Sequence, residues 1–455
     1  MSKPTILIVS NSYKASPYND YFGLKRKVMR AHPLAPYIFA AQTPSHFDVK
    51  ICDIEDVKDY YSQENIAMAA FSTNVTCVVP KMYKASDKFH EKNIPVVWGG
   101  IHTSSVPSEV LNQGIDSVVI GQGEGIWPVL LDDLVAKGLK EIYFGSPSAV
   151  YNLLTEERAA ISGKSSFTAD RENYLGTVSP DWSYLNHIPQ VLQVVATRGC
   201  ENRCPHCSGY KVAGNSFQTK DIILIVNEIE AVLSHSKRKY ILFADNNLPQ
   251  NVDYAKELMD AIKGFNARYV CMASMPQLVE NETLVEKMAK AGMDTICIGF
   301  ETLNQSNHKG NDKDVSQYTY GIELLHKHGI AVFGSFILGF DGDTPASVDQ
   351  IIGFSDDNKI DLINVNVLTP FPGTVLSHKL KKEGRITTTD YALYDTRHAV
   401  IFTPHFSKEK LQIEFDRLRA AVYSPQRVSK RLFSKHGTLL TKAINLLELL
   451  SSKTN

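Results

Sequence analysis

The segment VLQVVATRGCENRCPHCSGY, residues 191–210, joins an apolar run typical of a buried strand to a loop with three cysteines. Cys200, Cys204 and Cys207 follow the spacing C-x3-C-x2-C. Three thiolates in one short loop form a soft, anionic site that suits zinc or an iron–sulfur cluster. A closed zinc site needs a fourth ligand, and the nearest candidate is His206, whose neighbour Cys207 would already be a ligand. The spacing favours a cluster with one iron open for chemistry, while zinc and inert thiols stay open as alternatives.

Apolar runs and helical segments alternate regularly beyond this strand. The runs after 191–199 are 240–247, 269–274, 295–301, 330–340 and 362–373. Helical periodicity fills the intervening segments 219–234, 252–264, 281–291, 315–328 and 345–357. Six such repeats predict a full or partial TIM-like barrel over residues 189–384. The cysteines follow the first strand, and the active sites of barrels lie at the carboxyl ends of their strands.

A separate α/β domain is predicted for residues 1–144. Its apolar runs are 5–10, 49–54, 66–72, 95–100 and 117–123, with helices expected at 79–92 and 107–113. Apolar runs of this kind, separated by helices, indicate a doubly wound, Rossmann-like parallel sheet that binds ligands at the carboxyl ends of its strands. Small, polar and glycine residues follow those ends, and the candidate binding residues are Ser10, Ser72, Thr73, Asn74, Gly99, Gly100, His102, Gly121, Gly123 and Glu124.

The remaining segments predict a linker and a helical tail. Residues 145–188 lack periodicity and read as the linker, and residues 385–455 read as a helical extension that ends in the amphipathic stretch 438–450. Four further cysteines, each in an apolar run, are expected to be small buried hydrophobic residues; they are Cys52, Cys77, Cys271 and Cys297.

Composition and charge restrict the class of protein. The 455 residues are 43% hydrophobic and 21% charged, which excludes a disordered chain. A net charge of −1 gives no general attraction to nucleic acid, so no nucleic-acid partner is expected. The first residues lack the features of a secretory signal, and no apolar stretch approaches the roughly 20 residues that span a bilayer. A cytoplasmic protein is therefore expected, with peripheral membrane contact left open.

The cysteine spacing and its place after the first barrel strand resemble the radical S-adenosylmethionine (SAM) superfamily. The resemblance implies a [4Fe–4S] cluster on Cys200, Cys204 and Cys207, whose open iron binds the amino and carboxylate groups of SAM. It also implies a reductant such as flavodoxin or ferredoxin, whose electron releases a 5′-deoxyadenosyl radical. The family usually has an aromatic residue before the third cysteine, where this chain has His206.

Other strand ends of the barrel extend the resemblance. Asp245, after the second strand, is the candidate contact to the SAM amino group. Glu301, after the fourth strand, is similar to a carboxylate that binds the ribose hydroxyls or the amino group. Gly334 and Gly339 belong to a stretch that resembles the strand bordering the adenine. A carboxylate in such a place is otherwise a helix cap or a solvated group.

The first domain resembles the cobalamin-binding domain of B12-dependent radical SAM proteins. The resemblance rests on 95–111, with its Gly-Gly-x-His turn, and on 114–125, with Gly-x-Gly-Glu; with the barrel it reaches to about residue 425. The Asp-x-His-x-x-Gly motif, whose His ligates cobalt, does not occur in the sequence. Any cobalamin is therefore expected to be bound with its dimethylbenzimidazole displaced and no His below the metal, and His102 is expected to line the cofactor edge or to shape a turn. The alternative is a plain turn in a flavodoxin-like domain.

These resemblances imply an enzyme that methylates an unactivated carbon of a small-molecule or lipid substrate through SAM and cobalamin. The first alternative is a radical SAM enzyme of the same layout that oxidises, cyclises or couples carbons without methyl transfer. The second is a redox or cobalamin sensor without catalysis.

Overall fold

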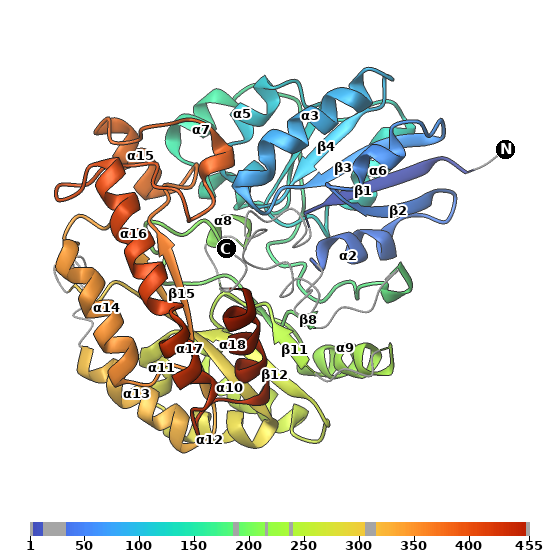
Figure 1. Cartoon of the computed structure of the whole chain (residues 1–455). Coiled ribbons are helices and arrows are strands. Elements are labelled where there is room, and N and C mark those ends of the chain that lie inside the picture. The colour runs from blue at the N-terminus through green and yellow to red at the C-terminus, as the bar shows by residue number, and fades with distance from the viewer. Residues whose placement is uncertain are drawn as a thin grey trace.

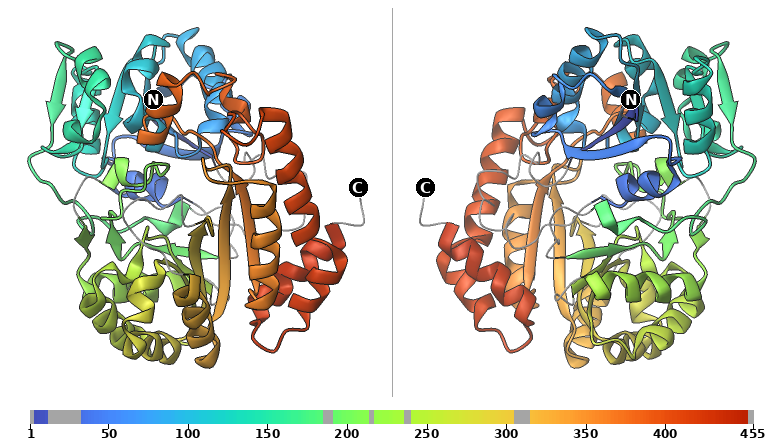
Figure 2. Two further views of the ribbon diagram at one scale, coloured as in Figure 1. Left: turned by 90° about the vertical axis from the view of Figure 1, so that its left-hand side faces the viewer. Right: turned by 90° about the vertical axis from the view of Figure 1, so that its right-hand side faces the viewer.

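The computed structural model describes residues 3–11, 33–184, 191–213, 217–235, 240–304 and 315–451. The chain forms two parallel sheets, each covered by helices, with a helical C-terminal extension packed along the second (Figure 1). The first sheet lies above the second in both side views of Figure 2, so that the cysteine loop falls in the region between them.

The first sheet is parallel and seven-stranded, in the order β2-β1-β3-β4-β5-β6-β7. Its strands are β1 (Thr5–Ser10), β2 (Asp48–Asp53), β3 (Ile66–Ser72), β4 (Val96–Gly99), β5 (Ser117–Ile120), β6 (Ile142–Phe144) and β7 (Ser166–Thr168). The helices around it include α2 (Ala35–Gln42), α3 (Val79–His90), α4 (Ile101–Ser105), α5 (Pro107–Asn112) and α6 (Trp127–Val135).

Strand β1 lies between β2 and β3 in this sheet and is buried along its whole length. Leu7 and Val9 belong to the cluster that includes residues of α3 and α5, whereas Ile6 and Ile8 belong to the cluster with α2 and α6. Because helices cover both faces, the strand has no polar face, and its apolar run has no alternation. The predicted doubly wound α/β architecture is confirmed.

The sheet continues into the segment for which the sequence predicts a linker. Strand β7 lies within the predicted linker and pairs in parallel with β6, which ends just before residue 145, so that β7 forms the edge of the sheet. The same segment carries α7 (Thr155–Ala160). Strands of three residues are too short to show a period, which explains why the sequence pattern gives no sign of them. Residues 185–188 of that segment lie outside the described residues.

The second sheet has six parallel strands in the order β8-β11-β12-β13-β14-β15. They are β8 (Leu192–Val194), β11 (Tyr240–Phe243), β12 (Arg268–Ala273), β13 (Met293–Glu301), β14 (Ala331–Leu338) and β15 (Leu362–Val367). Between them run α9 (Ile222–His235), α10 (Val252–Ile262), α12 (Glu282–Ala291), α13 (Val315–Lys327) and α14 (Pro345–Asp357). Within the described ranges β8 and β15 stay unpaired at the two edges, so the predicted barrel is the partial form.

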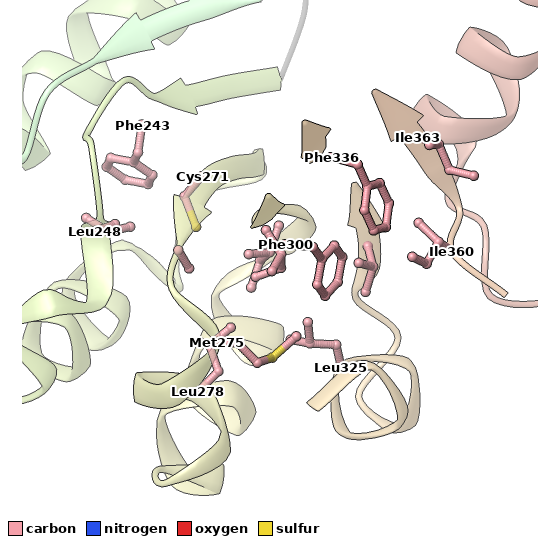
Figure 3. Close-up of a cluster of buried hydrophobic side chains, with 14 of the residues drawn as sticks. Phe243, Leu248, Cys271, Met275, Leu278, Phe300, Leu325, Phe336, Ile360 and Ile363 are labelled. Carbon is pink, nitrogen blue, oxygen red and sulfur yellow. The ribbon is translucent and has the colours of Figure 1, made fainter. Parts of the chain in front are cut away.

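The helix-facing side of this sheet holds the main hydrophobic core (Figure 3). Phe300 of β13 stacks on Phe336 of β14 at 5.1 Å between ring centroids, and both rings contact Phe354 of α14. Alternate residues of the same strands, among them Gly299 and Ser335, are only partly buried. Since side chains alternate along a strand, these residues face the inside of the open barrel.

The C-terminal extension is helical, as the sequence predicts. It consists of α15 (Val375–Lys382), α16 (Lys408–Val422), α17 (Pro425–Leu432) and α18 (Leu439–Ser451), with the short turn η8 (Tyr391–Leu393) before α16. Helix α16 packs on α14 and β15, whereas η8 contacts α3 of the first domain. The extension therefore touches both domains (Figure 2). Within the described residues, no helix is long and apolar enough to cross a membrane.

Candidate active site

The cysteine loop is closed at its base by a small antiparallel ladder. Strand β9 (Thr197–Arg198) pairs with β10 (Gln218–Thr219), and the loop between them contains all three cysteines. Gly199 and Arg203 have positive φ values of 96° and 43°, which turn the backbone sharply. The N–H of Cys207 donates to the carbonyl of Cys204 at 3.0 Å. The loop lies just after β8, at the carboxyl end of the first barrel strand.

None of the three cysteines forms a disulfide, and their arrangement differs from a compact zinc site. Among the described residues, no group of three or more His, Cys, Asp or Glu side chains could hold a metal ion. A [4Fe–4S] cluster is larger than a zinc ion and binds each cysteine at a different iron, so the three sulfur atoms do not need to meet at one point. Burial raises the pKa of the Cys200 and Cys207 thiols, because the charged form loses its hydration. A cationic iron centre would offset that cost, so the donor set fits the cluster.

Glu301 ends β13 in an unusual backbone conformation. Its φ is +61°, and the pairing with β14 is irregular between Gly299 and Glu301. A Cβ atom at Gly299 would lie 2.5 Å from Glu301 Oε1, so the carboxylate folds back over the glycine. The left-handed region costs a non-glycine residue roughly 1–2 kcal/mol, and such strain concentrates at functional sites. Burial, and to a smaller extent the negative charge of Glu301, raises the pKa of the Cys207 thiol.

Asp245 is buried beside the segment that leads into the cysteine loop. Its side chain is 1% exposed and accepts hydrogen bonds from the backbone N–H groups of Ala196 and Thr197. Burial raises its pKa to about 6. Asp245 thus fixes the strand that leads into the cysteine loop, and its expected contact to the SAM amino group stays a prediction. The exposed neighbour of Asp245, Asn246, is not among the predicted site residues, yet it lies near the third cysteine. A Cβ atom built on Gly209 would lie 3.4 Å from Asn246 Oδ1 and 3.5 Å from Cys207 Sγ.

The two glycines expected beside the adenine have packing and turn roles. Gly334 lies on the helix-facing side of β14, where a Cβ atom would lie 3.0 Å from Phe300 Cε2. Gly339 has a φ of +119° and donates its N–H to Asp343 Oδ2 at 2.9 Å, so it forms the turn after the strand. The barrel-facing residues of β14 are instead Phe333, Ser335 and Ile337, which are only partly buried. The expected position of the two glycines beside the adenine stays a prediction.

Cys297 also departs from its expected environment. Cys52, Cys77 and Cys271 are buried, as their apolar surroundings predict, but Cys297 is partly exposed on the barrel-facing side of β13. Desolvation and the charge of Glu301 raise its pKa to about 12, so it is a neutral thiol at ordinary pH.

A cavity lies between the carboxyl edge of the first sheet and the start of the barrel. Its walls are mostly apolar, and seven of the ten expected binding residues line it: Ser72, Asn74, Gly99, Gly100, Gly121, Gly123 and Glu124. Val195 and Arg198, from the barrel side, are also part of the lining. Gly100, with φ of +101°, leaves no room for a side chain, because a Cβ atom would lie 2.8 Å from Asn74 Oδ1. Apolar walls with a few polar groups suit a large cofactor such as a corrin.

The other three expected residues lie outside the described lining of this cavity. Ser10 and Thr73 are buried, and the Thr73 hydroxyl donates to the Gly99 carbonyl at 2.7 Å. His102 is 2% exposed, with Nε2 3.7 Å from Glu109 Oε1 and its ring edge-on to Tyr391 of the C-terminal extension at 5.2 Å. This buried environment favours the turn role of the two expected for His102, and its contact to the cofactor edge stays a prediction. No histidine occurs among the described residues that line the cavity.

Arg198 connects the cavity to the cysteine loop. Its Nη2 lies 2.6 Å from Glu124 Oε1, and its Nη1 donates to Gln122 Oε1 at 2.7 Å. Both acceptors belong to the segment after β5, whereas Arg198 stands two residues before Cys200. Sequence reasoning missed both Arg198 and Gln122, because no local pattern relates residues 76 positions apart.

Comparison with known proteins agrees with this geometry. Residues 194–354 match the model of the radical SAM superfamily, and residues 374–444 match a domain of unknown function, DUF4070. The bacteriochlorophyllide d C-12(1)-methyltransferase of Chlorobaculum tepidum is 27% identical over 419 residues, which cover 89% of this chain and 85% of that protein. The hopanoid C-2 methylase of Rhodopseudomonas palustris is 24% identical over 79% of this chain and 66% of its own length.

Two solved structures share the fold over almost the whole chain. The radical SAM methyltransferase TsrM of Kitasatospora setae, with cobalamin and a [4Fe–4S] cluster bound, has a TM-score of 0.68 at 15% identity and covers both chains fully. The cobalamin-dependent radical enzyme OxsB, with aqua-cobalamin and SAM bound, has a TM-score of 0.68 at 14% identity over 99% of this chain and 71% of that one.

The partial barrel, the three-cysteine loop after its first strand and the match over 194–354 define a radical SAM enzyme. The domain over residues 194–354 belongs to the radical SAM superfamily, and the chain as a whole is similar in sequence to the methyltransferases named above and in fold to the two cobalamin-binding enzymes.

Proposed function

We propose that this enzyme methylates an unactivated carbon of a small-molecule or lipid substrate, with cobalamin in the cavity of the first domain. The observation that carries the proposal is the common boundary of the two sites. Arg198 lines the cavity and stands two residues before the first cysteine of the loop, so a cofactor in the cavity would lie beside the cluster. The methyltransferases among the relatives support the same reaction.

When bound, the cluster and cobalamin would supply reductive cleavage of SAM and a transferable methyl group. Cys200, Cys204 and Cys207 would hold the cluster, and the Glu301 carboxylate would accept hydrogen bonds from the ribose hydroxyls or the ammonium of SAM. The apolar walls of the cavity would keep water from the reactive groups. An external reductant such as flavodoxin or ferredoxin would deliver the electron.

The names of the relatives suggest two substrate classes for comparison. Two relatives methylate bacteriochlorophyllide d, and two are hopanoid methylases. Another relative is an anaerobic magnesium-protoporphyrin IX monomethyl ester cyclase of Cereibacter sphaeroides, 24% identical over 78% of this chain and 60% of its own length. That cyclase favours the second candidate function, which is oxidative ring formation without methyl transfer.

Product analysis with labelled SAM separates the two functions. Anaerobically reconstituted enzyme is incubated with cobalamin, reductant, methyl-deuterated SAM and either a bacteriochlorophyllide or a hopanoid. Methyl transfer predicts a deuterated product together with both 5′-deoxyadenosine and S-adenosylhomocysteine. Formation of 5′-deoxyadenosine and an unlabelled, oxidised product, independent of cobalamin, would contradict the proposal and favour the second function.

A further inference from the structure

Arg198 forms a buried link between two segments that carry different sites. Its guanidinium contacts Glu124 at 2.6 Å and Gln122 at 2.7 Å, and the side chains of Arg198 and Glu124 are 18% and 9% exposed. A planar guanidinium that bonds two acceptors fixes direction as well as distance. Removal of one partner from such a buried pair leaves a charge without compensation, so the link resists separation.

The cavity end of this link is itself held in place. Gln122 Oε1 also accepts the backbone N–H of Tyr174 at 3.3 Å, and Gln122 Nε2 donates to the carbonyl of Glu172 at 3.1 Å. The backbone carbonyl of Glu124 accepts Gln42 Nε2, from the end of α2, at 2.8 Å. The acceptors of Arg198 are therefore connected to the elements that enclose the cavity.

The cysteine end begins at a short ladder, and its other supports lie beyond Cys200, where the Glu201 N–H donates to Gln250 Oε1 at 3.1 Å and the Leu376 N–H donates to the Pro205 carbonyl at 2.9 Å. Strand β9 comprises only Thr197 and Arg198, and its ladder with β10 has two residue pairs. Asp245 holds the backbone at Ala196 and Thr197, but Arg198 is the last residue of β9 before the turn at Gly199 and the cysteines. The side chain of Arg198 thus fixes the final position from which the loop departs.

We infer that Arg198 is a positioning residue that couples occupancy of the first-domain cavity to the geometry of the cluster loop. The inference rests on the proposed function, since it takes a corrinoid as the ligand of the cavity. A corrinoid that packs against Gln122 and Glu124 restricts their side chains, and Arg198 transmits this restriction to residue 200. Bound corrinoid then favours the loop geometry that holds the cluster. Because the coupling of two binding events is reciprocal, protein that carries the cluster must in turn bind cobalamin in the cavity more tightly.

The test compares hydroxocobalamin affinity in cluster-free and cluster-reconstituted protein. Visible absorption titrations under anaerobic conditions give the two dissociation constants. The wild type should bind about 10-fold more tightly when the cluster is present, within the usual range of such coupling. In Arg198→Gln and in Glu124→Gln the ratio should fall to about one, and the double variant should show no further change. Glu141→Gln, which breaks the more exposed Glu141–Lys164 pair of the same domain, is the matched control and should keep the wild-type ratio.

A second measurement guards against variants that fold poorly. Hydrogen exchange over residues 196–207 should slow when cobalamin is added to the wild type, but not when it is added to Arg198→Lys, which keeps the charge and loses the planar fork. An unchanged affinity ratio in Arg198→Gln, with cobalamin bound, would overturn the coupling and leave the proposed function intact. Failure of the wild type to bind hydroxocobalamin would overturn both.

Discussion

Replacement of Glu301 by glutamine tests whether the strained carboxylate at the end of β13 serves SAM. The substitution preserves side-chain shape and the left-handed backbone at φ +61°, so it leaves the strain of roughly 1–2 kcal/mol unchanged. It removes the negative charge that raises the pKa of Cys207, so cluster assembly should not weaken. The melting temperature and the iron content should both stay at wild-type values.

The effect on SAM follows from the strength of the lost contacts. A hydrogen bond to a charged group contributes about 1.5–3 kcal/mol, and a tenfold change in affinity corresponds to about 1.4 kcal/mol. Loss of one such bond should therefore weaken SAM binding on the order of 10- to 100-fold. Equilibrium dialysis of SAM against cluster-loaded protein measures this directly, and the yield of 5′-deoxyadenosine should fall with it.

A matched control separates the local effect from a general loss of charge. Glu323→Gln changes an exposed carboxylate of α13, on the opposite side of the sheet, and should leave SAM affinity unaltered. If Glu301→Gln unfolds the protein while the folded fraction keeps its SAM affinity, Glu301 is a structural residue and the assignment is refuted.

Three further predictions follow from the described contacts. Wild-type protein should carry on the order of one [4Fe–4S] cluster per chain, seen as absorbance near 400 nm. Replacement of Cys200, Cys204 and Cys207 together by alanine should abolish this absorbance and all SAM cleavage, whereas Cys271→Ala should keep the cluster. Iron retained in the triple variant would contradict the ligand set. Cobalamin is expected to bind with its dimethylbenzimidazole displaced, and no described residue lining the cavity is a histidine, so the EPR spectrum of the Co(II) form should lack nitrogen superhyperfine splitting; clear splitting would count against this. Burial raises the pKa of Asp245 from 3.8 to about 6, so its protonated form favours the fold; this contribution is complete below pH 3.8 and is lost as the pH rises through 6. Asp245→Asn should therefore reduce the fall in unfolding free energy between pH 4 and pH 7, and an unchanged pH dependence of chemical denaturation would show that another group causes it.

The order of strands and helices could be predicted because both sheets are parallel and covered. In β1 and β13 the apolar runs are long enough to identify a strand, and helices of ordinary length separate them. The same reasoning fails for β7, where three residues at the edge of a sheet leave no pattern. It also fails to decide which side of β14 faces the cofactor, since Gly334 and Ser335 differ by one position and face opposite ways.

The parts of the site that escaped prediction depend on pairing across the domains. The cysteine spacing is a local signal, and the glycines after the first-domain strands are local as well. Arg198, by contrast, looks from the sequence like one more residue of the cysteine motif, and Glu124 like the end of a Gly-x-Gly-Glu turn. Only the folded chain shows that the arginine ends 2.6 Å from that carboxylate, with both side chains mostly hidden from solvent. Each charge of this buried pair compensates the desolvation cost of the other, because burial of either charge alone would cost too much free energy. A movement of the first domain against the barrel that keeps this pair intact would therefore displace the residue two positions before Cys200.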